Sequence, residues 1–122
     1  MLDLLHLAAY YALQKSDDDD RAFLLGSVGV RSDGRIVHSK NSASNNIIPE
    51  AHSEARLTKK LGFNATVYVA RVSRGTKELA MARPCKSCQN ILRSFRVKNV
   101  YYTISKNEYG MLNLATMVDT YY

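Results

Sequence analysis

Hydrophobic and polar residues follow periodic patterns that predict a mixed α/β chain. Apolar residues recur at helical spacing between Leu2 and Leu13, which predicts an amphipathic helix. Residues 22–30 form an apolar run short enough for a buried strand. Arg31-Ser32-Asp33-Gly34 then predicts a turn into a second strand over residues 35–38. The two strands should therefore pair as a hairpin.

The middle of the chain alternates between loop, helix and strand patterns. The expected elements are a polar loop over 41–49, a helix over 51–61, a third strand over 66–72, an extended segment over 78–82, a second helix over 85–95 and a fourth strand over 97–105. Gly62 directly follows the first of these helices, and glycine commonly ends a helix. The order of these elements predicts one layered α/β domain.

The C-terminal tail admits two interpretations. Met111, Leu114, Ala115 and Val118 fit the spacing of a helix. Residues 107–110 instead fit a hairpin loop closed by a glycine. We favour the hairpin, which makes a fifth strand antiparallel to the fourth, whereas a helix would allow a parallel return.

Length and composition limit the chain to one domain. With 122 residues, of which 46% are hydrophobic, residues 1–122 can form one ordinary core and no second one. The run from Leu2 to Leu13 lacks a basic leader and is too short to span a bilayer. We therefore expect no membrane insertion and a cytoplasmic location, where cysteines stay reduced.

The charge favours negatively charged partners without identifying one. The net charge of +6 suits phosphorylated or polyanionic ligands, although most basic residues in any protein only solvate the surface. Asp17 to Asp20 form one acidic run shortly after the first predicted helix. Because the helix C-terminus is itself partially negative, this run is better explained as a solvated loop than as a calcium site.

Two short motifs carry candidate metal chemistry. His52-Ser53-Glu54 is followed, further along the chain, by Pro84-Cys85-Lys86-Ser87-Cys88. His52, Cys85 and Cys88 supply three ligands for Zn²⁺ and leave the fourth tetrahedral position open to water. The chain has only two cysteines, so one subunit cannot form a four-cysteine structural site. A redox pair is the alternative for C-x-x-C alone, but nothing else here suits a thioredoxin-like unit.

The spacing of both motifs makes sense if each one opens a helix. Pro84 suits the first turn of a helix, and Cys85 and Cys88 then lie three residues apart on one face. A helix N-terminus also favours thiolate over thiol. In mid-helix, His52 and Glu54 would point apart. At a first turn His52 can bind the metal while Glu54 faces the substrate.

H-x-E followed by P-C-x-x-C is the signature of zinc nucleobase deaminases, and the order of elements resembles the cytidine deaminase superfamily over about residues 22–105. The resemblance implies a three-layer α/β fold with a mixed central sheet of about five strands, helices on both faces and an antiparallel C-terminal hairpin. It also implies hydrolytic deamination. Zinc lowers the pKa of its bound water, and Glu54, which is not a ligand, moves the protons.

The resemblance suggests several substrate contacts. Asn41 matches the offset of a sugar-binding asparagine, with Asn45 and Asn46 as neighbouring alternatives. A backbone carbonyl near Ser53 or Arg83 would orient the exocyclic amine. Phe23 would stack on the base, or else belong to the core.

Arg83 departs from the family pattern, which often has threonine and glutamate, or serine, before Pro-Cys. As the residue before a proline it should be extended and lie at the rim of the site. A guanidinium there would select a phosphorylated substrate by binding its phosphate. The alternative is a surface arginine paired with Glu50 or Glu78. The segment 73–82 is also extra relative to the family.

Three functions fit these observations. The favoured one is deamination of a cytosine nucleoside or nucleotide (cytidine, deoxycytidine or dCMP) to the uracil product, since the chain is small. The alternative is deamination of cytosine or adenine in single-stranded DNA or RNA, which the basic charge and eight tyrosines favour. The third is a zinc module without catalysis, against which Glu54 argues.

Two further expectations concern partners. The resemblance suggests a homo-oligomer, either a dimer or a tetramer. If the substrate is a polynucleotide, a stripe of basic side chains should lead to the zinc. Its expected members are Arg56, Arg71, Arg74, Lys77, Lys86 and Arg93.

Overall fold

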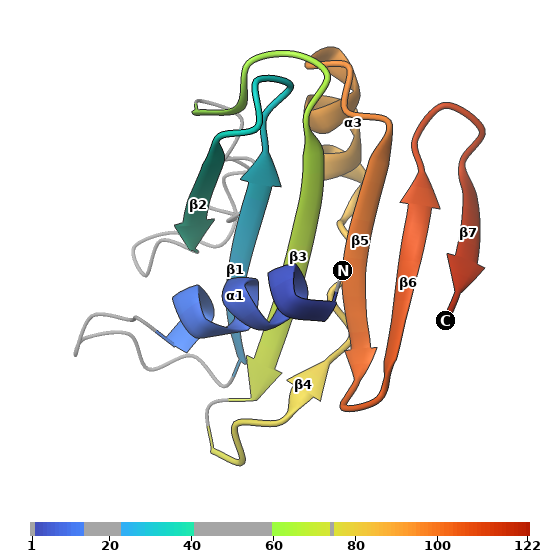
Figure 1. Ribbon diagram of the computed structural model, residues 1–122. Helices are drawn as coiled ribbons and strands as arrows, with labels where there is room; N and C mark the ends of the chain where they lie inside the picture. The colour runs from blue at the N-terminus through green and yellow to red at the C-terminus, as the bar shows by residue number, and fades with distance from the viewer. Residues whose placement is uncertain (1, 14–22, 41–59, 74) are drawn as a thin grey trace.

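The computed structural model describes residues 2–13, 23–40, 60–73 and 75–122 (Figure 1). The elements in this part of the chain are α1 (Leu2–Leu13), β1 (Phe23–Val30), β2 (Ile36–Lys40), β3 (Thr66–Ser73), β4 (Leu79–Ala80), α3 (Lys86–Ser94), β5 (Asn99–Ser105), β6 (Glu108–Asn113) and β7 (Val118–Tyr121). Of the helix expected over 51–61, only its end at residues 60–61 is described, and Gly62 follows it with φ +67°. The left-handed conformation of Gly62 confirms it as the helix stop.

The strands form one mixed sheet in the order β2-β1-β3-β5-β6-β7, with the short β4 paired to β3 (Figure 1). β3 and β5 are parallel, and the other neighbouring pairs are antiparallel. The mixed sheet is confirmed, but it has seven strands in the described residues rather than about five. The two additional strands are β4, which has two residues, and β7, which has four.

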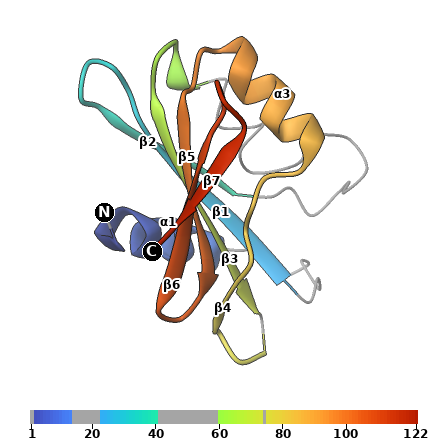
Figure 2. The same ribbon diagram turned by 90° about the vertical axis from the view of Figure 1, so that its right-hand side faces the viewer.

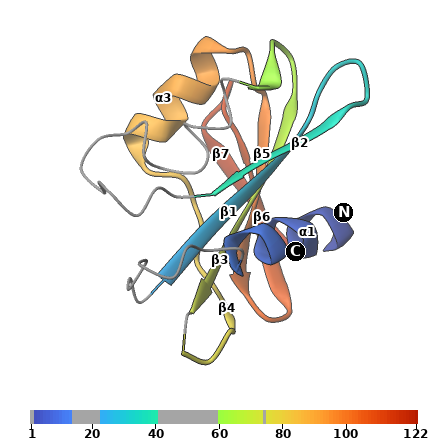
Figure 3. The same ribbon diagram turned by 90° about the vertical axis from the view of Figure 1, so that its left-hand side faces the viewer.

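The helices cover opposite faces of the sheet, which confirms the three-layer arrangement (Figures 2 and 3). On one face, Leu5 and Ala8 of α1 pack with Val28. On the other face, Leu92 of α3 belongs to a core cluster with Val69 and the strand residues around it. Because both faces are covered, β3 is buried continuously from Val67 to Ala70 instead of alternating.

Helix α1 lies directly on strand β1 at Gly26. A Cβ atom at this position would lie 2.2 Å from the carbonyl oxygen of Ala8 and 2.6 Å from the backbone nitrogen of Ala12. Only a residue without a side chain allows this contact between two backbones.

None of the helices in the described ranges is long and apolar enough to cross a membrane.

The C-terminal hairpin is confirmed, and the helical alternative for the tail is wrong. β5 and β6 pair antiparallel, with Tyr102 directly opposite Gly110. The predicted loop over 107–110 is misplaced, because residues 108–110 already belong to β6. Gly110 does not close a turn. A Cβ atom on it would lie 2.6 Å from Cζ of Tyr102, so the glycine makes room for that ring.

The two adjacent tyrosines of β5 face opposite sides of the sheet. Tyr102 is fully buried in the cluster under α3. Tyr101 points to the α1 side and stacks on Tyr68 with ring centroids 5.0 Å apart. β5 therefore contributes aromatic packing to both layers.

Candidate metal centre

The two halves of the predicted site differ in how much the structure describes. His52, Ser53, Glu54 and Asn41 lie outside the described residues, together with the rest of the segment 41–59. Phe23 begins β1, but its side chain is not among those described. The ligand and catalytic roles of these residues therefore stay predictions. The part of the predicted site that the structure describes is the segment from Ala80 through Cys88.

Cys85 and Cys88 lie at the N-terminus of α3, as predicted. Cys85 is the N-cap residue, with an extended backbone (φ −67°, ψ 164°), and Cys88 follows in the first turn. The Cys85 side chain is exposed, whereas Cys88 is buried. Pro84 was expected in the first helical turn, but it precedes the N-cap residue. The extended conformation of Cys85 makes this helix start one residue later.

The helix N-terminus suits anionic sulfur ligands. Its unpaired backbone N–H groups give it a partial positive charge. No acidic side chain lies in the first turn of α3. Thiolates at Cys85 and Cys88 would therefore be the anionic groups that the N-cap and first turn of α3 themselves contribute.

Gln89 fixes the backbone around Cys85. Its side chain is buried, and Nε2 donates a 2.8 Å hydrogen bond to the carbonyl oxygen of Pro84. Its backbone N–H donates to the carbonyl oxygen of Cys85 at 2.9 Å. One residue thus holds two consecutive peptide carbonyls and sets the direction in which the chain enters α3.

Thr103 holds the preceding segment against β5. The Thr103 carbonyl accepts a 2.9 Å hydrogen bond from the backbone N–H of Ala82, and its Oγ1 donates to the Ala80 carbonyl at 2.7 Å. The same Oγ1 accepts from the backbone N–H of Arg71 at 3.2 Å. Thr103 is buried, so these bonds are shielded from water. Thr103 therefore fixes the segment before Pro84 at two positions, Ala80 and Ala82.

The sequence patterns do not predict the roles of Gln89 and Thr103. Both are polar residues whose partners are backbone carbonyl or amide groups, and no side-chain pattern in the sequence indicates such bonds. The only available signal was the position of Gln89 directly after Cys88.

Arg83 is partly exposed beside the cysteines and pairs with a residue of the last strand. Its Nε lies 2.9 Å from Oδ2 of Asp119 in β7, and the two side chains are 39% and 15% exposed. The partner is therefore Asp119 rather than the proposed Glu78, and Glu50 lies outside the described residues. Tyr121 also donates to Oδ2 of Asp119, at 3.2 Å.

The predicted basic stripe is described only in part. Arg56 and Arg74 lie outside the described ranges. Lys86 and Arg93 lie at opposite ends of α3. The stripe stays a prediction.

The donor chemistry of the described residues fits zinc. Within the described ranges no three His, Cys, Asp or Glu side chains gather closely enough to hold a metal ion. The two thiols supply two of the three predicted ligands, and the third, His52, lies outside these ranges. Two sulfur donors three residues apart at a helix start suit the soft, tetrahedral preference of Zn²⁺.

Comparison with known proteins finds a matching family and proteins of similar structure. The family model described as "Cytidine and deoxycytidylate deaminase zinc-binding region" matches residues 2–104. The cytidine deaminase of Mycobacterium leprae has a similar structure, with a TM-score of 0.59 and 19% identity over 95% of this chain and 94% of that one. The cytidine deaminase of Mycobacterium tuberculosis gives a TM-score of 0.59 and 18% identity over 94% and 90%. No curated protein matches the sequence. At these identities the structural likeness shows a shared fold.

Proposed function

The chain belongs to the cytidine and deoxycytidylate deaminase family, and we propose that it is a zinc-dependent hydrolase that converts a cytosine nucleoside or nucleotide to its uracil product. The substrates that fit are cytidine, deoxycytidine and dCMP. The observation that carries the proposal is the P-C-x-x-C segment at the start of α3, where Gln89 fixes the backbone around the exposed Cys85 and Cys88 is buried.

We propose that His52, Cys85 and Cys88 hold one Zn²⁺. When bound, zinc supplies a water molecule of lowered pKa that serves as the nucleophile. The buried Cys88 would anchor the ion, while the exposed Cys85 would lie toward the side open to solvent.

Glu54 carries the proton transfers in this proposal. Its carboxylate takes a proton from the attacking water, donates one to the ring nitrogen and passes another to the departing amine. Water thus adds to the amine-bearing carbon, the carbon–nitrogen bond breaks, and ammonia leaves. A carboxylate that does not bind the metal is suited to this role because it keeps its proton affinity.

The remaining residues would bind and orient the substrate. Asn41 holds the sugar, a backbone carbonyl at Ser53 or Arg83 accepts a hydrogen bond from the exocyclic amine, and Phe23 stacks on the base. The Arg83 side chain selects a phosphorylated substrate. Support for this role comes from its partial exposure next to Pro84.

A base within single-stranded DNA or RNA is the alternative substrate, favoured by the net charge of +6. As in the sequence interpretation, we propose a homo-oligomer in the cytoplasm. A reducing compartment would keep both thiols available as ligands.

Metal analysis combined with a substrate panel tests the proposal. Purified protein should contain one zinc per chain and release ammonia from at least one of cytidine, deoxycytidine, dCMP or a cytosine-containing oligonucleotide. Cys88→Ser should lose zinc and activity, whereas Ser87→Ala, an exposed neighbour that is not a ligand, should keep both. A zinc-loaded protein that releases no ammonia from any of these substrates would contradict the proposed function.

A further inference from the structure

A surface cavity of about 380 Å³ lies at the end of α3 opposite the cysteines. Its walls come from the end of α3, the segment that leads into β5, and the turn after β6. Cys85 caps the other end of this helix of nine residues, which spans about 13 Å at about 1.5 Å per residue. The cavity is therefore separate from the candidate metal centre.

Three basic side chains surround this cavity. Arg93, Arg96 and Lys98 all line it, and all three are exposed. No acidic residue is among the residues that line it. In the described part of the chain, the ion pairs join Arg31 to Asp33 and Arg83 to Asp119, so none of the three cations has a described carboxylate partner. Their charges repel one another, and an anion in the cavity would relieve that repulsion.

The turn that presents Arg96 has a backbone conformation that favours glycine. Arg96 has φ +60°, in the left-handed region. Its N–H donates to the Arg93 carbonyl at 2.9 Å, and the Val97 N–H donates to the Leu92 carbonyl at 3.1 Å. These bonds end α3 in the manner of a helix C-terminal motif, where glycine is the usual residue. An arginine at this position is therefore not explained by the turn itself.

Backbone contacts from other segments fix the cavity. The Asn64 N–H donates to the carbonyl of Phe95 at 3.2 Å, and the Leu114 N–H donates to the carbonyl of Lys98 at 2.7 Å. Leu114 and Val97, which also line the cavity, are buried. The segments that carry the three cations are thus fixed by backbone hydrogen bonds and by buried apolar residues.

We propose that this cavity binds a phosphate group, held by the guanidinium groups of Arg93 and Arg96 and by the ammonium group of Lys98. Arginine pairs with two phosphate oxygens at once, and lysine adds a point charge. The cavity volume lies within the usual range for small-molecule sites. The phosphate is that of a nucleotide or of a single-stranded nucleic acid backbone. The inference does not depend on deaminase activity, because it rests on the cavity alone.

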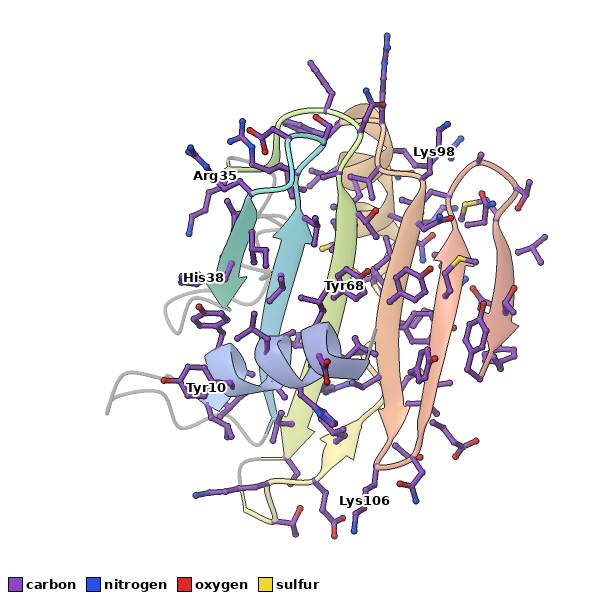
Figure 4. All side chains as sticks on the ribbon, viewed as in Figure 1. Tyr10, Arg35, His38, Tyr68, Lys98 and Lys106 are labelled. Atoms are coloured by element: carbon purple, nitrogen blue, oxygen red, sulfur yellow. The ribbon has the colours of Figure 1, made fainter. Side chains whose placement is uncertain are left out.

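Binding measurements on the full chain test this inference. Two probes are used. Binding of inorganic pyrophosphate is measured by calorimetry, and binding of a fluorescent oligothymidylate is measured by fluorescence anisotropy at low salt. The test variant is Arg96→Gly combined with Lys98→Ala, in which glycine suits the left-handed φ. The control is Lys106→Ala, an exposed lysine after the opposite end of β5 (Figure 4). Arg93→Gln serves as a second test variant if the double variant loses its thermal unfolding transition.

We expect the double variant to weaken probe binding by ~10-fold or more, and the control to change it by less than about 2-fold, since only the former removes cavity charges. For the oligonucleotide, the slope of log K against log salt should fall by about 1.4, since each single-strand phosphate contact contributes about 0.7. Pyrophosphate binding that depends on the cavity identifies a small phosphate ligand. Cavity-dependent binding of the oligonucleotide alone identifies a polynucleotide. Absence of binding by both probes, or an equal loss in Lys106→Ala, would overturn the inference.

Discussion

The side-chain amide of Gln89 donates a 2.8 Å hydrogen bond to the carbonyl oxygen of Pro84, inside the segment that presents both cysteines. Pro84 and Gln89 are both buried, so water cannot replace this bond. The contact links the position after the second cysteine to the position before the first. The spacing of the two sulfur atoms therefore depends on a residue that is not itself a ligand.

Replacing Gln89 should affect both stability and metal affinity. Gln89→Leu keeps the side chain volume similar but leaves the Pro84 carbonyl buried without its donor, which costs about 1–3 kcal/mol. Mutation of a residue that orients metal ligands typically lowers metal affinity by about 10–100-fold. Urea unfolding and competition with a zinc chelator measure the two effects. Asn90→Ala, an exposed change on the same helix, is the control, and unchanged zinc affinity in Gln89→Leu would refute the positioning role.

Arg83→Ala tests the selection of a phosphorylated substrate. The variant should raise KM for dCMP and leave kcat/KM for deoxycytidine nearly unchanged, because only the former offers the guanidinium a phosphate. Asp119→Asn is the matched control. It removes the carboxylate contacted by Arg83 but keeps the guanidinium, so selectivity for dCMP should persist. Equal losses on both substrates in Arg83→Ala would show that the residue has only a structural role.

Gly110→Ala should destabilise the fold. The added Cβ would lie 2.6 Å from Cζ of Tyr102, a fully buried ring that has no room to move. Overpacking of this kind typically costs about 1–3 kcal/mol. Chemical denaturation measures the loss. Gly75→Ala is the control, because a Cβ added there would meet no atom within 4 Å. A similar small effect in both variants would contradict the assigned role of Gly110.

Tyr102 should make stability fall at alkaline pH. Burial, and then the charge of Asp119, raises the pKa of Tyr102 from 10.0 to about 12. Since the folded state favours the protonated phenol, this contribution is complete below pH 10 and is lost as pH rises toward about 12. Tyr102→Phe should flatten the free energy of unfolding over this window. Tyr68 and Tyr101 also have raised pKa values, so part of the slope should remain. An unchanged slope would contradict this assignment.

Sequence patterns predicted the elements whose spacing reflects burial. The helix over residues 2–13, the strands β1 and β3 and the start of α3 all follow from apolar periodicity or from glycine and proline positions. β7 was missed because its four residues are largely exposed and carry no alternating apolar signal. Because β7 was not predicted, its residue Asp119 could not be predicted as the partner of Arg83.

The remaining errors concern contacts between segments that are distant in sequence. Gly110 has the composition of a turn, and only its pairing with Tyr102 reveals that it accommodates a ring. Gln89 and Thr103 bind backbone carbonyls, which no side-chain motif can indicate. Local sequence patterns thus predict helices and strands. The residues that hold the candidate metal centre in place depend on how those helices and strands pack.

The deamination rate of zinc-loaded Glu54→Ala, compared with that of the wild-type protein, tests the central claim most directly. The account predicts that the variant keeps one zinc per chain and loses activity by about 10²–10⁴-fold, the usual contribution of a general acid–base residue. Ammonia release from the best substrate of the panel provides the measurement, and zinc content is determined on the same samples. A variant that keeps its zinc and deaminates at the wild-type rate would contradict the proposed mechanism.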